Sequence, residues 1–304
     1  MSAGAADHAS LWLDLIDTPF EYGWLDASGI RTRYLRAGPK DAPALILIPG
    51  TAGTLETFIS NIPAHAQHFN CYAMDSLGSG FTDKPEGDYE LPRYVEHLAA
   101  FMKAAGLRKA SLMGCSLGAW IAARFALTHP DMVEKVTLVS PAGMTANPET
   151  MKRVSSGRSS AVDDPSWENL MRIFEVLILD PKKRHPEIVG ARQTAYRRPD
   201  MKDAMRRILC LQDMTVRQRN LVREEEWRNM KPLVLVFGGT SDRESDLEKG
   251  RMIVEWMPRA GMVAVENCGH WPHLEARDAF NAINVEFLRS GLPAEKRERT
   301  IVAP

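Results

Sequence analysis

A single serine lies between two glycines at the point where an apolar run gives way to a helix-like segment. In the stretch SLMGCSLGAW, Ser116 is flanked by Gly114 and Gly118. Small residues at these spacings allow a sharp strand-to-helix turn that presents a serine hydroxyl as a nucleophile. The same glycines would also suit a tight turn without chemistry, because short motifs of common residues recur by chance. Ser116 is therefore a candidate nucleophile that the rest of the chain must support.

A serine hydroxyl needs a histidine to remove its proton and a carboxylate to orient that histidine. Asp242 and His270 each follow an apolar run of strand length, in the order serine, acid, histidine. Because the carboxyl ends of parallel strands share one edge of a sheet, we expect Ser116, Asp242 and His270 to meet there as a catalytic triad. Asp242 could instead serve a turn or a helix cap, and Asp246 and His273 are nearby competitors.

The elements that must position these residues alternate between strand and helix patterns, which is typical of an α/β fold with a mostly parallel central sheet covered by helices. Strands are predicted at 44–48, 71–75, 110–113, 136–140, 233–237 and 262–265. Helices are predicted at 91–105, 117–128, 245–256 and 277–288. An opening hairpin is expected from Phe20 to Asp26 and Ile30 to Arg36.

The alternation stops between residues 141 and 230, and this stretch is too long for an ordinary loop. We interpret it as an inserted helical cap, with residues 1–140 and 231–304 forming the core. Residues 151–230 hold 17 Lys and Arg against 12 Asp and Glu, a net of +5, although the whole chain has a net charge of -1. The excess indicates either a solvated helical surface or a cap that attracts an anionic ligand.

Composition narrows the class of protein. A chain of 304 residues that is 44% hydrophobic can bury a large core. Its near-neutral charge and the lack of a long apolar run disfavour nucleic-acid and membrane partners. We expect a cytoplasmic location, since the first 30 residues are acidic and lack an export signal pattern and the four cysteines show no disulfide or metal-ligand spacing. No cofactor or metal motif is found. The sequence is also compatible with a homo-oligomer.

The triad order and its context resemble the α/β-hydrolase family, over about residues 24–291. Within it the chain is most similar to meta-cleavage-product hydrolases, which cut a carbon-carbon bond in dienoic keto acids from aromatic-ring degradation. The segments 30–38 and 267–275, followed by Phe280 and Asn281, carry this likeness. The resemblance implies a small-molecule substrate with a carboxylate and places Arg192 at the substrate-binding arginine. A surface arginine paired with Glu187 is the simpler interpretation of Arg192.

Further candidate site residues follow from the strand-to-helix turn at Ser116, known as a nucleophile elbow, and from the family resemblance. The backbone N–H groups of Thr51 and Leu117 are the expected oxyanion donors, with Gly50 letting the loop approach the substrate. Asn61 is a candidate substrate contact that could instead pin a helix, and Trp271 lies beside the candidate base.

Two functions are compatible with these residues. One is hydrolysis of a carbon-carbon bond in a meta-cleavage-type acid, and the alternative is a carboxylesterase acting on small esters. Cys115 and Thr57 stand where the resembled enzymes tend to carry asparagines near the dienolate, and an ordinary ester needs no such amide. A non-catalytic ligand-binding protein on the same fold is a minor alternative, since such proteins usually lose a triad member and none is missing here.

Overall fold

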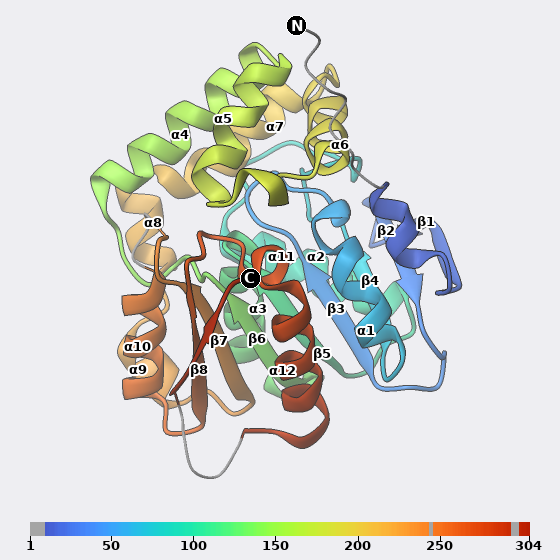
Figure 1. Ribbon diagram of the computed structural model, residues 1–304. Coiled ribbons are helices and arrows are strands. Elements are labelled where there is room, and N and C mark those ends of the chain that lie inside the picture. The colour runs from blue at the N-terminus through green and yellow to red at the C-terminus, as the bar shows by residue number, and fades with distance from the viewer. Residues whose placement is uncertain (1–9, 243–245, 293–297) are drawn as a thin grey trace, which may run out of the picture.

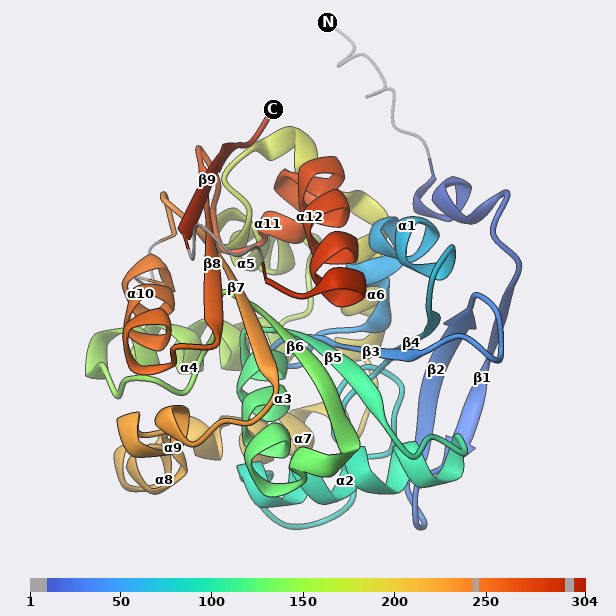
Figure 2. The same cartoon turned by 90° about the horizontal axis from the view of Figure 1, so that it is seen from below.

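The sheet is the frame on which the candidate triad is placed. A computed structural model of the chain describes residues 10–242, 246–292 and 298–304. Within them the strands form a 9-stranded sheet in the order β1-β2-β4-β3-β5-β6-β7-β8-β9 (Figures 1 and 2). The strands are β1 (Phe20–Asp26), β2 (Arg31–Ala37), β3 (Ala44–Ile48), β4 (Asn70–Met74), β5 (Ala110–Cys115), β6 (Val133–Val139), β7 (Leu233–Gly239), β8 (Ala260–Glu266) and β9 (Glu298–Val302).

The pairing of these strands confirms the mostly parallel sheet. From β4 to β9 all neighbours are parallel, whereas β1 pairs with β2 and β2 pairs with β4 in antiparallel fashion. The predicted hairpin is present, with Asp26 opposite Arg31. β6 begins at Val133, earlier than the predicted residue 136, because Val133 is buried beside Ala110. The prediction omitted the edge strand β9, whose residues alternate between exposed and partly buried and which pairs in parallel with β8.

Helices cover both faces of the sheet, as the α/β pattern predicts. Figure 2 shows α1 and α12 on one face and α2 and α3 on the other. The core helices are α1 (Ile62–Ala66), α2 (Leu91–Ala104), α3 (Leu117–Thr128), α10 (Asp246–Trp256), α11 (Pro272–Glu275) and α12 (Arg277–Ser290), with short 3-10 turns at η1 (Leu11–Leu15), η2 (Leu55–Asn61) and η3 (Pro130–Met132). Parallel strands covered on both faces become apolar throughout. Every residue of β3 and β5 is accordingly buried.

The stretch 141–230 consists of helices and the irregular segments that connect them, with no strand among these described residues. This confirms the predicted helical insert between β6 and β7. It contains α4 (Pro148–Asp163), α5 (Trp167–Leu177), η4 (Pro181–Lys183), α6 (Pro186–Tyr196), α7 (Met201–Ile208), η5 (Leu209–Gln212), α8 (Met214–Asn220) and α9 (Glu224–Arg228). Helices α4 to α7 lie above the sheet in Figure 1, whereas α9 lies beside α10 of the core. The insert therefore combines a cap above the sheet with a return segment along the core.

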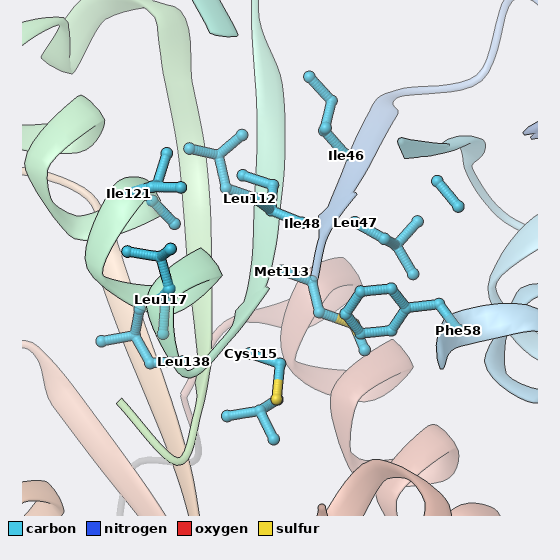
Figure 3. Close-up of a cluster of buried hydrophobic side chains, with 14 of the residues drawn as sticks. Ile46, Leu47, Ile48, Phe58, Leu112, Met113, Cys115, Leu117, Ile121 and Leu138 are labelled. Atoms are coloured by element: carbon cyan, nitrogen blue, oxygen red, sulfur yellow. The ribbon is translucent and has the colours of Figure 1, made fainter. Parts of the chain in front are cut away.

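Buried side chains of β3, β5 and α3 form the centre of the core (Figure 3). Ile48, Leu112, Leu117 and Ile121 lie together there and are at most 5% exposed. The first turn of α3 is thereby anchored in apolar surroundings, because its side chains pack against two adjacent strands.

Two glycines allow the end of β5 and the start of α3 to pack without a gap. A methyl group at Gly118 would lie 2.0 Å from the carbonyl oxygen of Ile48, and one at Gly114 would lie 2.2 Å from the carbonyl oxygen of Gly118. Both distances are far below van der Waals contact with backbone atoms that cannot move independently. Only glycine therefore fits at these two positions.

We predict that Gly118→Ala lowers the free energy of unfolding by about 1–3 kcal/mol or more, because the new methyl group overpacks the backbone of β3. Gly157→Ala is the matched control, since Gly157 also lies in a helix but has nothing within 4 Å of its added methyl group. The control is expected to gain about 0.5–1 kcal/mol from helix propensity. Urea unfolding of both variants measures the contrast, and a stable Gly118→Ala protein would contradict this account of the turn.

Candidate active site

Ser116 occupies a strained turn at the carboxyl end of β5. Its backbone has φ 53° and ψ -113°, a conformation that non-glycine residues rarely adopt. The turn is fixed by the bond from Ser116 N–H to the carbonyl of Val139 at 2.9 Å, and the Ser116 carbonyl accepts from Ala119 and Trp120 at 3.1 Å each. The geometry is that of an elbow that holds the serine at the tip between a strand and a helix.

The loop after β3 lies against this serine. A methyl group at Gly50 would lie 3.3 Å from Cβ and 3.9 Å from Oγ of Ser116. The loop closes on itself through a bond from Gly53 N–H to the Gly50 carbonyl at 2.9 Å, with Thr51 at the turn. Leu117 is the first residue of α3, so its N–H belongs to the group that has no acceptor within the helix. Thr51 and Leu117 thus stay the predicted oxyanion donors, one in the loop that lies against Ser116 and one directly after Ser116 in the chain.

Asp242 and His270 meet at the same edge of the sheet. His270 Nδ1 lies 2.7 Å from Asp242 Oδ2, and the two side chains are 4% and 2% exposed. The loops after β7 and β8 approach each other closely at Gly239, the last residue of β7. A methyl group at Gly239 would lie 2.0 Å from the carbonyl oxygen of Gly269, so only glycine allows this approach. A carboxylate at Nδ1 favours the tautomer in which Nε2 can accept a proton. This arrangement is the one that a general base and its orienting acid require.

His273 and Asp246 are the competing candidates for the base and the acid. His273 is fully buried among aromatic rings, with its ring centroid 5.2 Å from that of Phe58 and 6.1 Å from that of Phe280. Burial, reinforced by repulsion from His270, lowers the pKa of His273 to about 3, so this ring stays neutral at ordinary pH. The side chain of Asp246 lies outside the described residues.

Arg192 is buried in the cap, and none of the described residues gives it an anionic partner. The residue is 2% exposed, and within the described part of the chain its Nε and Nη1 have no hydrogen-bond acceptor. Glu187 does not pair with it, because the Glu187 carboxylate accepts from Ser10 Oγ at 2.8 Å and from the backbone of Leu11. The surface-pair interpretation of Arg192 is therefore wrong.

Aromatic rings hold the guanidinium beside the loop after β3. Its carbon lies 5.0 Å from the ring centroid of Phe174 and 5.7 Å from that of Trp271. A methyl group at Gly53 would lie 3.2 Å from Arg192 Nη2. Trp271, a predicted site residue, is itself 3% exposed and meets Phe174 edge to face at 5.5 Å. Burial lowers the pKa of Arg192 to about 10, which reflects the cost of a desolvated cation.

Asn61 lies deeper in the core, at the end of η2. Its amide nitrogen donates to the His273 carbonyl and to Asn281 Oδ1, both at 2.8 Å. Both amide hydrogens are used in these contacts, which join η2 to the histidine segment and to α12. This geometry favours the pinning role of Asn61 over the substrate contact.

Two further residues belong to the site, and the sequence patterns assigned no role to the second of them, Glu275. Phe174 is one apolar residue among several in α5, and only its place under Arg192 distinguishes it. Glu275 is 1% exposed, and its carboxylate accepts hydrogen bonds from the backbone N–H of Gly269, directly before His270, and from that of Leu179 in the cap. A carboxylate five residues after a candidate base, in an otherwise apolar turn, was the signal available for it.

The described residues contain no group of three or more His, Cys, Asp or Glu side chains that could hold a metal ion. Over the same residues, no helix has both the length and the apolar character needed to cross a bilayer. A pocket of about 340 Å³ lies between α4 and α5, where Arg153 and Arg158 face Ile173 and Leu177. The pocket contains no triad residue but borders the site at Leu177, whose carbonyl accepts from His270 N–H.

Comparison with known proteins identifies the family. Residues 43–277 match the family model described as the alpha/beta hydrolase fold. The chain belongs to the α/β-hydrolase family. It is 26% identical over 271 residues, 87% of this chain and 90% of the relative, to a 2-hydroxy-6-oxo-6-(2'-aminophenyl)hexa-2,4-dienoic acid hydrolase of Metapseudomonas resinovorans. It is 25% identical over 218 residues, 71% of this chain and 75% of the relative, to a 2-hydroxymuconate semialdehyde hydrolase of Pseudomonas putida.

A solved structure gives the same fold. The 2-hydroxy-6-oxo-6-phenylhexa-2,4-dienoate hydrolase from Rhodococcus sp. strain RHA1 superposes with a TM-score of 0.80 at 22% identity, covering 90% of this chain and 100% of that one. The chain is thus an α/β hydrolase related at low identity to meta-cleavage-product hydrolases.

We predict that Ser116→Ala and His270→Ala each reduce kcat by several orders of magnitude, and that Asp242→Asn costs on the order of 10⁴-fold, with smaller changes in KM. A serine-directed phosphonate should label Ser116 in the wild type. His273→Ala is the control for the choice of histidine. It should lower the thermal midpoint of unfolding while changing kcat little, because the His273 ring is packed in the core. Equal loss of kcat in the His270 and His273 variants would show that the base is misassigned.

Proposed function

We propose that this α/β hydrolase is a serine hydrolase that cleaves a carbon-carbon bond in a dienoic keto acid of the meta-cleavage type. The observation that carries the proposal is Arg192, which is buried next to the loop against Ser116 and has no anionic partner among the described residues. A desolvated cation without a partner is costly, and an anionic substrate that binds beside it would repay that cost. The meta-cleavage relatives support the same substrate class by their names.

In this mechanism Arg192 holds the substrate carboxylate with parallel hydrogen bonds, and the reacting carbonyl lies at Ser116. The dienol is first ketonised with help from His270, which makes the leaving carbon fragment a stabilised anion. His270 then removes a proton from Ser116 or from a water molecule, and the resulting oxygen nucleophile attacks the carbonyl carbon.

Collapse of the tetrahedral oxyanion, held by the N–H groups of Thr51 and Leu117, breaks the carbon-carbon bond. The imidazolium of His270, stabilised by Asp242, returns its proton to the carbon fragment that leaves. On the serine route, water hydrolyses the acyl-enzyme in a second cycle of the same steps. Overall one water is added across one carbon-carbon bond, giving a carboxylic acid and a dienoic acid.

A carboxylesterase is the second candidate, and the residues near the nucleophile favour it in one respect. Cys115 and Thr57, which stand where the resembled enzymes tend to carry asparagines, are both buried. The Thr57 hydroxyl has no hydrogen-bond partner within the described residues. Turnover of p-nitrophenyl esters of graded length, in parallel with coloured ring-cleavage dienoates, separates the two functions.

We predict that Arg192→Ala lowers kcat/KM for dienoic acids roughly tenfold to 150-fold, because a charged hydrogen bond is lost. This corresponds to a loss of about 1.5–3 kcal/mol of transition-state stabilisation. Uncharged esters should be nearly unaffected. Arg192→Lys should recover only part of the loss, since a lysine cannot make two parallel bonds.

Arg217→Gln is the matched control for Arg192. Arg217 is also a buried cap arginine, but it donates to the Thr145 carbonyl at 2.8 Å and packs on Trp120. Its variant should destabilise the cap and affect both substrate classes equally. Equal losses on both substrates in the Arg192 variants would point to misfolding of the cap, and no loss on either would overturn the carboxylate role.

The pH dependence of the two substrate classes should also differ. Because the pKa of Arg192 in the free enzyme is lowered to about 10, its positive charge is fully present well below pH 10 and is lost as the pH rises through that value. We expect kcat/KM for dienoic acids to fall above about pH 10, and this alkaline limb should be absent for neutral esters. The Arg192→Ala variant serves as the control, and an identical limb for both substrates in the wild type would contradict the assignment.

A further inference from the structure

Glu275 is a buried carboxylate at the end of α11 whose hydrogen bonds reach two separate segments. Its Oε1 accepts from the backbone N–H of Gly269 at 2.8 Å, and its Oε2 accepts from the backbone N–H groups of Leu179 at 2.8 Å and Asp180 at 3.1 Å. The residue is 1% exposed. A single side chain thus binds both the loop before His270 and the cap segment after α5.

The same two segments also touch each other directly. The backbone N–H of His270 donates to the Leu177 carbonyl at 2.8 Å. A methyl group at Gly269 would lie 3.0 Å from both the Leu177 carbonyl oxygen and the Leu179 nitrogen. No side chain larger than hydrogen fits comfortably between the segments, so a shift of the cap segment shifts the backbone of His270 as well.

The carboxylate of Glu275 is balanced by backbone donors and not by a cation. Within the described residues it forms no ion pair with Lys, Arg or His, and its neighbour Cys268 is a weak donor, with Sγ 3.6 Å from Oε1. Burial raises the pKa of Glu275, and the backbone hydrogen bonds oppose this shift. Three N–H groups converging on a buried carboxylate make a rigid junction, because releasing any of them leaves an unsatisfied polar group.

We propose that Glu275 is a positioning residue that sets the place of His270 and of cap residues 177–180 together. The inference rests on the proposed function, since it assigns His270 as the base. Asp242 orients the imidazole through Nδ1, whereas Glu275 fixes the backbone from which that imidazole extends. The closed position of the cap is thereby linked to the catalytic position of the base.

The test is the isosteric variant Glu275→Gln, which keeps the shape but turns one acceptor into a donor. The amide nitrogen must then face either Gly269 N–H or the pair at Leu179 and Asp180, so one side of the junction is broken. We expect kcat and the rate of phosphonate labelling at Ser116 to fall about tenfold to hundredfold, with a smaller change in KM, because a misplaced base affects the chemical step. Amide hydrogen exchange should rise in both 177–180 and 268–270. Glu275→Asp, which keeps the charge, should recover part of the labelling rate.

Glu187→Gln is the matched control, because Glu187 also ties the cap to another segment but contacts Ser10 and Leu11 instead of the histidine loop. It should leave the labelling rate unchanged. If Glu275→Gln lowers the thermal midpoint but not the labelling rate, or if exchange rises in only one of the two segments, the positioning role is overturned. If the wild type itself is not labelled at Ser116, the proposed function fails, and that outcome is distinct from a failure of the junction.

Discussion

The close approach of α3 to the end of β3 is the constraint on which the site depends. Gly118 lies so near the Ile48 carbonyl that the helix must begin directly beside the strand, and Gly114 allows the turn to fold back on that helix. Between them Ser116 is held at a positive φ that it would not adopt alone. The buried side chains around Leu117 stabilise this strained turn, because unwinding it would expose apolar surface of the core.

The charged side chains around Ser116 differ in whether they have a partner of opposite charge. Asp242 and His270 form a buried pair in which the carboxylate has a partner suited to stabilise it. Arg192, in contrast, is buried against aromatic faces and lacks an anion among the described residues. In the proposed function, the first arrangement prepares a base and the second offers a place for a substrate carboxylate.

Buried and partly buried carboxylates connect separate segments of the fold. Glu187 ties α6 to the segment at Ser10, and Glu275 ties the cap after α5 to the loop before His270. On the core side, Arg33 bridges Asp75 of the β4 end and Glu56 of η2 at 2.7 and 2.8 Å. This last cluster steadies the segment that follows the oxyanion loop. Each junction is buried or partly buried, so each resists opening more strongly than a surface ion pair would.

The sequence by itself determined the family, the parallel sheet, the helical insert and the order of the candidate triad, because these depend on local periodicity and on spacing along the chain. It could not decide between His270 and His273, or between a paired and an unpaired Arg192. Those choices depend on which residues from distant segments share a buried environment, and only the tertiary packing brings Asp242, Glu187 and Phe174 to their partners. Glu275 shows the same limit, since its partners lie on two segments that sequence patterns do not connect.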